Sequence, residues 1–210
     1  MDDALARLLT GYPPVGESSG PEATVERVLD AALEEFVEVG LRRATVGAIA
    51  GRAGVAPATI YRRIGQRDAL VTAVIAREVM RGLAATATAF AAAEDPTEKV
   101  VEGFATAVEF LNGHPLLART VEFEVDMVAR LFTADAEVLL GLARAAVTDE
   151  LARLGETVGV SVRDPGAATE VLVRFGHSLA LTPSRDLLAD AGSARTFARK
   201  VFVPMVFDSE

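Results

Sequence analysis

The sequence predicts an all-α protein of about nine helices, and three observations support this prediction. Alanine, leucine, arginine and glutamate, all strong helix formers, are abundant; long alternations of β-branched residues are missing; and apolar residues recur at three- and four-residue spacing from Glu22 onward. Half of the 210 residues are hydrophobic, so enough apolar surface is available to offset the conformational entropy that folding costs.

The first 21 residues are expected to form a flexible arm. Glycine and proline gather in the second half of this segment and leave room only for a short helix over residues 2–9. A regular helix then begins at Glu22 and ends at Gly40, since glycine commonly follows the last turn of a helix. The apolar face of this helix consists of Val25, Val28, Leu29, Ala32, Phe36 and Val39.

Two short helices and one long helix follow. Thr45 is a good N-cap for a helix over Val46–Ala53, which Gly54 ends. A proline suits the first turn of the next helix, predicted over Pro57–Ile64, because its missing N–H group needs no partner there. Beyond Gly65 a long helix opens near residue 67 and runs to about residue 93.

Five further helices are expected in the rest of the chain, with breaks at Asp95-Pro96 and His114-Pro115. They span about Thr97–Asn112, Leu116–Val125, residues 132–155, Gly166–Leu181 and Gly192–Val203. The chain is therefore expected to contain the arm of residues 1–21, a three-helix head of residues 22–67 and a helical body of residues 68–210.

Charge is unevenly distributed along the chain. The total is −9, yet the segment from Leu41 to Arg77 holds seven arginines and one acid, Asp68, which gives +6. From Gly82 onward, 11 bases and 19 acids give −8. A basic segment on an acidic body is typical of a nucleic-acid-binding head, and the alternative is a solvated charged face.

Several classes of function are excluded or receive no support. The chain has no cysteine and only two histidines, which excludes disulfides, thiolate zinc sites, cysteine nucleophiles and an all-histidine metal cage. No apolar stretch approaches the ~20 residues of a membrane span, and the N-terminus lacks a signal peptide, so a cytoplasmic protein is expected. Nucleotide-binding and hydrolase motifs are absent, and neither a cofactor nor a metal is expected.

The two short helices joined through Gly54 describe a helix-turn-helix. In such a unit the first helix braces across the DNA backbone, and the second enters the major groove. Arginines, threonines and tyrosines of the second helix would supply contacts to phosphates and base edges. Short helix pairs with a glycine turn also occur in proteins that bind no DNA, so this pattern alone leaves both readings open.

Residues 25–74 resemble the DNA-binding head of TetR-type (tetracycline-repressor-type) transcriptional regulators. The matching features are Phe36 and Gly40, Thr45 before Val46 and Ile49-Ala50, Ala53-Gly54-Val55, Thr59-Ile60-Tyr61, and Arg67-Asp68-Ala69-Leu70. Three residues depart from the usual pattern: Ala56 stands where serine is frequent, Ile64 replaces phenylalanine and Arg67 replaces lysine.

The resemblance implies roles for individual residues of the head. Thr45 would cap a helix next to phosphate, Tyr61 would contact a phosphate, and Arg67 would pin the DNA backbone. The residues expected to face the groove are Pro57, Ala58, Thr59, Arg62 and Arg63. For Arg42 and Arg43, phosphate contact and simple solvation are left equally open.

The body resembles the family in architecture alone. Its aromatic residues are expected either to line an effector pocket or to form an ordinary apolar core, with Glu122 and Glu124 among the candidate polar anchors of such a pocket. The pocket candidates are Phe90, Phe104, Phe110, Phe123, Met127 and Phe132. No effector can be identified from these residues.

Residues 171–183 look like the eighth helix of some subfamilies, which would pair with the last helix in a four-helix dimer interface. The interface candidates are Leu172, Phe175, Gly176, Leu179, Phe197 and Val201. A two-fold dimer would present two recognition helices about one DNA turn apart, ~34–36 Å, and so read a palindromic operator. His114 is expected to end a helix, and His177 to be a buried interface histidine rather than a metal ligand.

Three functional hypotheses follow. The leading one is a homodimeric regulator, most simply a repressor, which binds double-stranded DNA and is released by a small apolar or amphipathic effector. The second is a helical ligand-binding or protein-interaction module that no longer reads DNA. The third, an all-α enzyme, has no motif in its favour.

Overall fold

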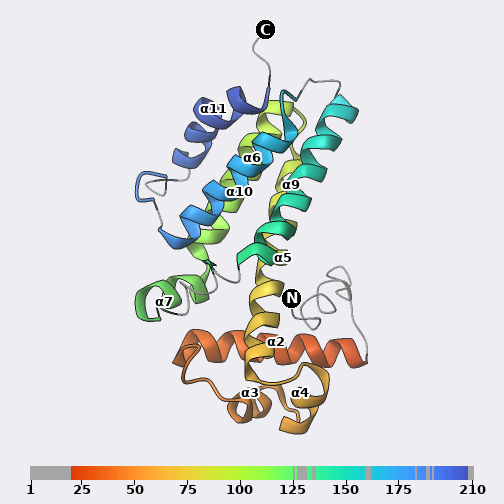
Figure 1. The fold of residues 1–210 in the computed structure, drawn as a ribbon, viewed down its shortest axis with the longest axis vertical. Coiled ribbons are helices and arrows are strands. Elements are labelled where there is room, and N and C mark those ends of the chain that lie inside the picture. Colours follow the sequence, from red (N-terminus) through yellow and green to blue (C-terminus); the bar gives the residue numbers. More distant parts are fainter. Residues whose placement is uncertain are drawn as a thin grey trace. The chain divides into compact units, whose positions relative to one another are not determined.

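The computed structural model describes residues 20–124, 126, 132–133, 136–158, 162–182, 184–187, 190 and 192–207, and these are largely helical (Figure 1). The expected N-terminal arm, apart from its last two residues, lies outside them. The helices are α2 (Pro21–Val39), α3 (Val46–Ala53), α4 (Pro57–Arg63), α5 (Arg67–Ala92), α6 (Pro96–Gly113), α7 (Pro115–Phe123), α9 (Ala136–Val158), α10 (Pro165–Leu181) and α11 (Ser193–Val206). The predicted all-α fold class is confirmed.

The chain forms two compact units. The first contains Met1–Val79 together with Glu122–Glu124, and the second contains Met80–Val121 together with Val125–Glu210. The boundary falls inside α5 rather than at its start, so that the long helix contributes residues to both units. The division into a head of residues 22–67 and a body of residues 68–210 stays a prediction about function.

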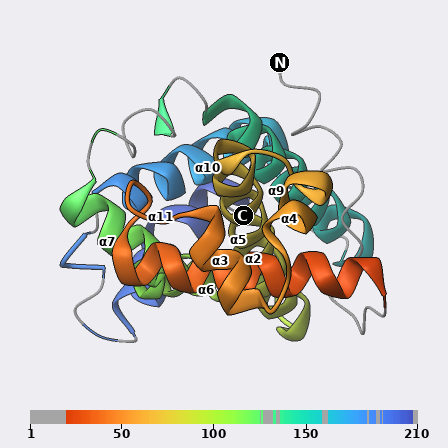
Figure 2. The same ribbon diagram turned by 90° about the horizontal axis from the view of Figure 1, so that it is seen from below.

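The first unit packs α2, α3, α4 and the beginning of α5 around one apolar core (Figures 1 and 2). The face of α2 predicted to be apolar is buried through Val28, Leu29, Ala32 and Phe36. The facing residues are Ile49 of α3, Ile60 of α4, and Leu70 and Val74 of α5, each fully buried. Burial of each such side chain stabilises the unit by about 1.5–3 kcal/mol, which helps to hold helices as short as α3 and α4.

Side-chain caps place several of the helix starts where the sequence predicts them. Thr45 accepts a hydrogen bond from the Ala48 amide at 3.2 Å, and its backbone is extended as an N-cap requires. Asp95 likewise caps α6 through the amides of Thr97 and Glu98, and Asp164 caps α10. These caps satisfy N–H groups that the first turn of a helix leaves without partners.

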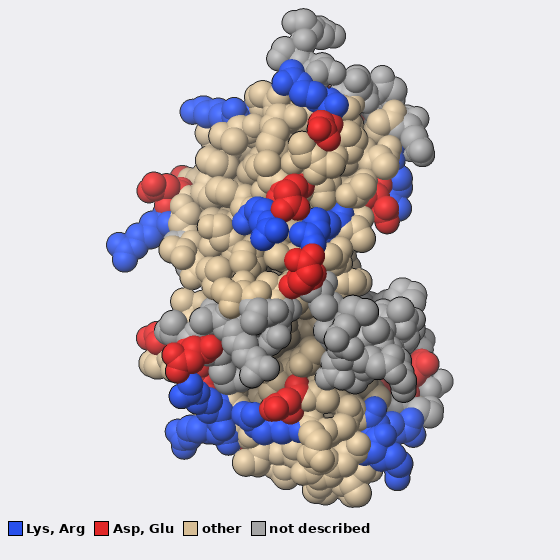
Figure 3. All heavy atoms as spheres, in the orientation of Figure 1, with Lys and Arg blue, Asp and Glu red and all other residues tan. Residues whose placement is uncertain are grey.

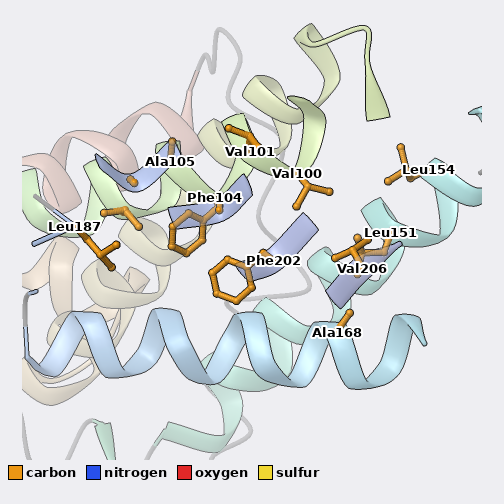
Figure 4. Packing of buried hydrophobic residues seen from close by; sticks show 13 residues of the cluster. Val100, Val101, Phe104, Ala105, Leu151, Leu154, Ala168, Leu187, Phe202 and Val206 are labelled. Carbon is orange, nitrogen blue, oxygen red and sulfur yellow. The ribbon is translucent and has the colours of Figure 1, made fainter. Parts of the chain in front are cut away.

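The second unit packs α6, α9, α10 and α11 around a core in which aromatic rings meet (Figure 4). The ring of Phe104 lies 4.7 Å from that of Phe202, and the rings of Phe175 and Phe197 stack at 5.4 Å. None of the described helices is long and apolar enough to cross a membrane.

Ion pairs join α6 to α11 at the edge of this core. The Arg195 guanidinium donates to both oxygens of Glu102 at 2.8 to 3.2 Å and to Glu109 at 2.9 Å, while Arg199 pairs with Glu98 at 2.7 Å. The hydrogen bonds from Arg195 hold the pKa of the Glu102 carboxyl below its ordinary value. A bidentate arginine–carboxylate pair is stronger than an ion pair made through a single hydrogen bond.

We expect Glu102→Gln to destabilise the protein by about 1 kcal/mol at pH 7, because the charged pair with Arg195 is lost. Since the folded pKa lies below the unfolded one, this stabilisation is fully present above about pH 4.3 and fades as pH falls through the folded pKa. Denaturant unfolding of the wild type and of Glu102→Gln from pH 7 to pH 3 measures the difference between their free energies of unfolding. This difference should become smaller as the pH falls. A difference that widens with acid would contradict this account. Glu137→Gln, which removes an exposed partner of Arg144, is the control.

Candidate nucleic-acid interface

The helix-turn-helix depends on the backbone at Gly54. This residue has φ 66° and ψ 35°, the left-handed conformation that glycine adopts without a steric penalty, and its N–H donates to the carbonyls of Ala50 and Gly51. Val55 then donates to the Ala50 carbonyl at 3.0 Å. The chain thereby turns within three residues, 54–56, and α4 begins at Pro57 as the sequence predicts.

One side of α4 is open. Ile60 faces the core and is fully buried, whereas Tyr61 is 48% exposed and Arg62 and Arg63 are exposed. At the beginning of the helix Pro57 and Ala58 are exposed, and Thr59 is half-buried. The residues predicted to face the groove therefore occur on a helix whose other side is anchored, which is the arrangement a recognition helix needs.

Two of the seven arginines in the basic segment are neutralised by carboxylates of the first unit. Arg52 on α3 pairs with Glu34, Glu35 and Glu38 of α2 at 3.3, 3.2 and 2.5 Å. The hydrogen bond to Glu38, followed by those to Glu34 and Glu35, raises the pKa of the Arg52 guanidinium above its ordinary value. These ion pairs join α3 to α2.

Arg77 on α5 is the second neutralised arginine, and its side chain is 1% exposed. It pairs with Asp30 at 2.7 Å, Glu78 at 2.9 Å and Glu26 at 3.5 Å. A buried guanidinium needs such partners, because removing its charge from water is costly. The count of +6 from the sequence therefore overstates the charge available to a phosphate backbone.

The remaining arginines of the basic segment contribute accessible positive surface to the unit, as does the exposed Arg27 of α2. Arg42, Arg43, Arg62 and Arg63 are exposed, and Arg43, Arg62 and Arg63 form no ion pair with any residue that the structure describes. In Figure 3 basic side chains stand on both sides of the part of the first unit that α2, α3 and α4 form, with uncharged surface and an acidic side chain between them. Cations without internal partners are the groups that can neutralise phosphates.

Arg67 at the beginning of α5 has internal partners on the loop between α2 and α3. Its Nε donates to the Ala44 carbonyl at 3.2 Å and its Nη2 donates to the Leu41 carbonyl, while Nη1 lies 3.5 Å from Asp68. The side chain is still 34% exposed. The phosphate contact expected of Arg67 stays a prediction, and the structure adds a second task for the same side chain.

Glu124 holds the other side of the same loop. Its two carboxylate oxygens accept from the amides of Leu41 at 2.7 Å and Arg42 at 2.8 Å, and the residue is 8% exposed. Sequence reasoning grouped this residue with pocket anchors and missed this role. No local pattern could reveal it, because the partners lie 83 and 82 positions apart.

The pocket candidates do not form one group among the described residues. Phe104 is buried in the aromatic cluster, and Phe90 packs at its edge under the Lys99 ammonium. The ring of Phe110 packs against Gly82: a Cβ atom added to this glycine would lie 2.7 Å from the Phe110 ring. Phe123 is 64% exposed, Phe132 faces the ring of His177, and Met127 lies outside the described residues.

The interface candidates divide between core and surface. Phe175 and Phe197 pack with Phe104, so a ring expected in the pocket and two rings expected at the interface belong to one cluster. Leu172 and Leu179 pack at the edge of the same core, Gly176 is half-buried, and Val201 is 44% exposed. Their expected part in a dimer stays a prediction.

Both histidines have roles inside the fold. His114 is the C-cap residue of α6, as predicted. The Nε2 atom of His177 lies 2.8 Å from the Phe132 carbonyl oxygen. The described residues contain no group of three histidines or carboxylates that could hold a metal ion.

Comparison with protein families supports the interpretation of this unit. Residues 28–74, which contain the helix-turn-helix, match the family model described as bacterial regulatory proteins, tetR family. Curated relatives in two strains of Mycobacterium tuberculosis, both named uncharacterized HTH-type transcriptional regulators, are 26% identical over 183 residues, 87% of each chain.

Solved structures share the fold over nearly the whole chain. The TetR family repressor AlkX from a Dietzia strain, implicated in biodegradation of n-alkanes, has a TM-score of 0.66 at 19% identity and covers 87% of this chain and 97% of its own. The regulator FadR from Bacillus subtilis, solved with stearoyl-CoA, has a TM-score of 0.57 at 16% identity and covers 88% of this chain and 99% of its own.

A serine at position 56 should stabilise α4. Ala56 already has the extended backbone of an N-cap but offers no side-chain acceptor. We expect Ala56→Ser to raise the free energy of unfolding by about 1 kcal/mol through a new bond to the first turn. Ala58→Ser, which makes the same chemical change inside the helix, should give no gain. Equal effects of the two substitutions in denaturant unfolding would contradict the capping argument.

Loss of the buried cation should be far more costly than loss of the exposed one. Arg77→Met should destabilise the protein by about 3 kcal/mol, because the guanidinium that it removes is only 1% exposed and holds ion pairs to Glu26, Asp30 and Glu78. Arg52→Met breaks as many ion pairs at an exposed site and should cause a much smaller loss. Thermal or denaturant unfolding compares the two variants, and a larger loss for Arg52→Met would reverse the assignment.

Proposed function

We propose, from the premise that this chain is a TetR-type helix-turn-helix transcriptional regulator, that it is a homodimeric repressor released from a palindromic operator by a small effector. The observation that supports this most strongly is the sorting of arginines in the first unit. Carboxylates neutralise Arg52 and Arg77, whereas Arg43, Arg62 and Arg63 are exposed and form no ion pair with a described residue. Arg62 and Arg63 lie on the recognition helix, Arg43 lies on the loop before α3, and the exposed Arg27 lies on α2.

The proposed contacts divide by what they can read. Arg62 and Arg63 on α4 would enter the major groove, where a bidentate arginine–guanine contact distinguishes bases by about 1–3 kcal/mol. Arg42, Arg43 and the exposed part of Arg67 would meet phosphates, which fix orientation without reading sequence. The proposed partner is double-stranded DNA. A cytoplasmic location of the protein is part of the same proposal.

The proposed effector is apolar or amphipathic. Two similar structures support this chemistry, since one belongs to a repressor implicated in n-alkane biodegradation and the other was solved with stearoyl-CoA. The aromatic rings of α6, α10 and α11 provide apolar surface of the matching kind. Release would follow if the effector preferred a conformation whose two recognition helices no longer fit successive grooves. The difference between its affinities for the two conformations sets how far the equilibrium shifts.

Selection of bound sequences from a random DNA pool tests this function directly. A dimeric reader should enrich a palindrome whose half-sites are centred about 10 base pairs apart, or a multiple of one turn. Arg62→Ala and Arg63→Ala should each lose preference at particular positions of that palindrome. A protein that no longer reads DNA would enrich nothing, and that result would reject the proposal.

Arg67→Ala should weaken binding to all sequences about equally, because a phosphate contact carries no sequence information. Fewer counterions are then released, so the slope of log K against log salt should become shallower by roughly one unit per half-site, about two for a dimer. Titrations at several salt concentrations measure this slope. Weaker binding with an unchanged slope would show that Arg67 acts only through its hydrogen bonds to the loop carbonyls, and would reject the phosphate contact.

A further inference from the structure

The loop of residues 40–45 between α2 and α3 is held by two opposite charges. From one side, the carboxylate of Glu124 accepts from the amides of Leu41 and Arg42. From the other, the guanidinium of Arg67 donates to the carbonyls of Leu41 and Ala44. Hydrogen bonds to charged groups are about twice as strong as neutral ones, so this short loop carries four strong bonds.

Burial makes these bonds hard to replace. Leu41 is 1% exposed and Glu124 is 8% exposed, so water has little access to the bonded amide. A buried N–H group that loses its acceptor retains the full cost of leaving water. The loop conformation seen here therefore depends on the Glu124 carboxylate being in place.

The loop positions groups on which DNA binding would depend. Arg42 and Arg43 are exposed on it, and its last residue, Thr45, caps α3. Gly40 at its beginning has φ 93°, so the chain turns sharply out of α2 there. A loop released from Glu124 would free Arg42 and Arg43 from a fixed position and loosen the entry to α3.

Glu124 also has an unusual place in the chain. It belongs to the first compact unit, as do its bonding partners, although the residues before position 122 and after position 124 belong to the second unit. The carboxylate thus comes from a three-residue segment of the first unit, and the chain on both sides of this segment belongs to the second unit.

We propose that Glu124 is a positioning residue for DNA recognition, which fixes the backbone of Leu41 and Arg42 so that Arg42, Arg43 and α3 face the DNA together. The inference rests on the proposed function and deepens it. Glu124 touches no DNA in this account; its effect passes through the loop.

The sign of one measurement separates this role from simple electrostatics. Glu124→Gln removes a negative charge, and on charge alone a protein with one fewer anion should bind DNA more tightly. A positioning role predicts the opposite result. The glutamine amide keeps one acceptor but presents a donor to the second backbone N–H, so the proportion of molecules with the fixed loop should fall and the apparent Kd should rise by the same factor.

The experiment titrates the full-length wild type, Glu124→Gln, Glu124→Ala and Glu122→Gln with the palindrome enriched from the random pool. Glu122→Gln is the matched control, because it makes the same charge change two residues away and Glu122 forms no hydrogen bond or ion pair with a described residue. Amide hydrogen exchange at Leu41 and Arg42 is measured on the same proteins without DNA, so the loop is tested independently of binding.

We expect Glu124→Gln to weaken binding by about tenfold with an unchanged salt slope, Glu124→Ala to weaken it further, and both to speed exchange at Leu41 and Arg42. Glu122→Gln should bind equally or slightly more tightly and exchange at the wild-type rate. Unchanged or tighter binding by Glu124→Gln, or exchange as slow as in the wild type, would overturn the proposal. A wild type without sequence preference would instead reject the proposed function, and this would be evident before any variant is compared.

Discussion

The backbone of Leu41 is held between a carboxylate and a guanidinium, and these bonds hold the loop that joins α2 to α3. Its N–H donates to Glu124 and its carbonyl accepts from Arg67, two side chains separated in sequence by most of α5 and all of α6 and α7. The loop so fixed sets the angle at which α3 leaves α2 and the place where Thr45 caps it. α4 follows through the Gly54 turn, so the exposed side of the recognition helix is set from the same point.

Burial and partners give the arginines of this unit three different tasks. Arg52 and Arg77 join helices, one at the surface and one in the core, and their charges are balanced by five carboxylates of α2 and one of α5. Arg67 shapes a loop while remaining partly exposed. Of the exposed arginines of this unit that form no ion pair with a described residue, Arg43 lies on the loop, Arg62 and Arg63 lie on α4, and Arg27 lies on α2, so the charge open to a polyanion is smaller than composition suggests.

Local signals in the sequence were sufficient for the helices and much of the helix-turn-helix. Apolar spacing identified the buried face of α2, and Thr45, Gly54 and Pro57 marked the ends of α3 and the beginning of α4, because caps and left-handed turns depend on near neighbours. Contacts across the chain were beyond such signals. Nothing near Glu124 indicates Leu41, and nothing near Phe104 indicates that it packs with Phe175 and Phe197, so rings assigned separately to a pocket and an interface proved to be neighbours.

The central claim is that the exposed arginines of a loop and helix fixed in this way read a particular DNA sequence. The most direct test is the ratio of two affinities at about 0.15 M salt, one for the DNA upstream of the protein's own coding sequence and one for random DNA of equal length. A specific regulator should prefer its site by ~10³-fold or more, since the phosphate contribution is common to both DNAs and cancels in the ratio. A ratio near one would contradict the claim.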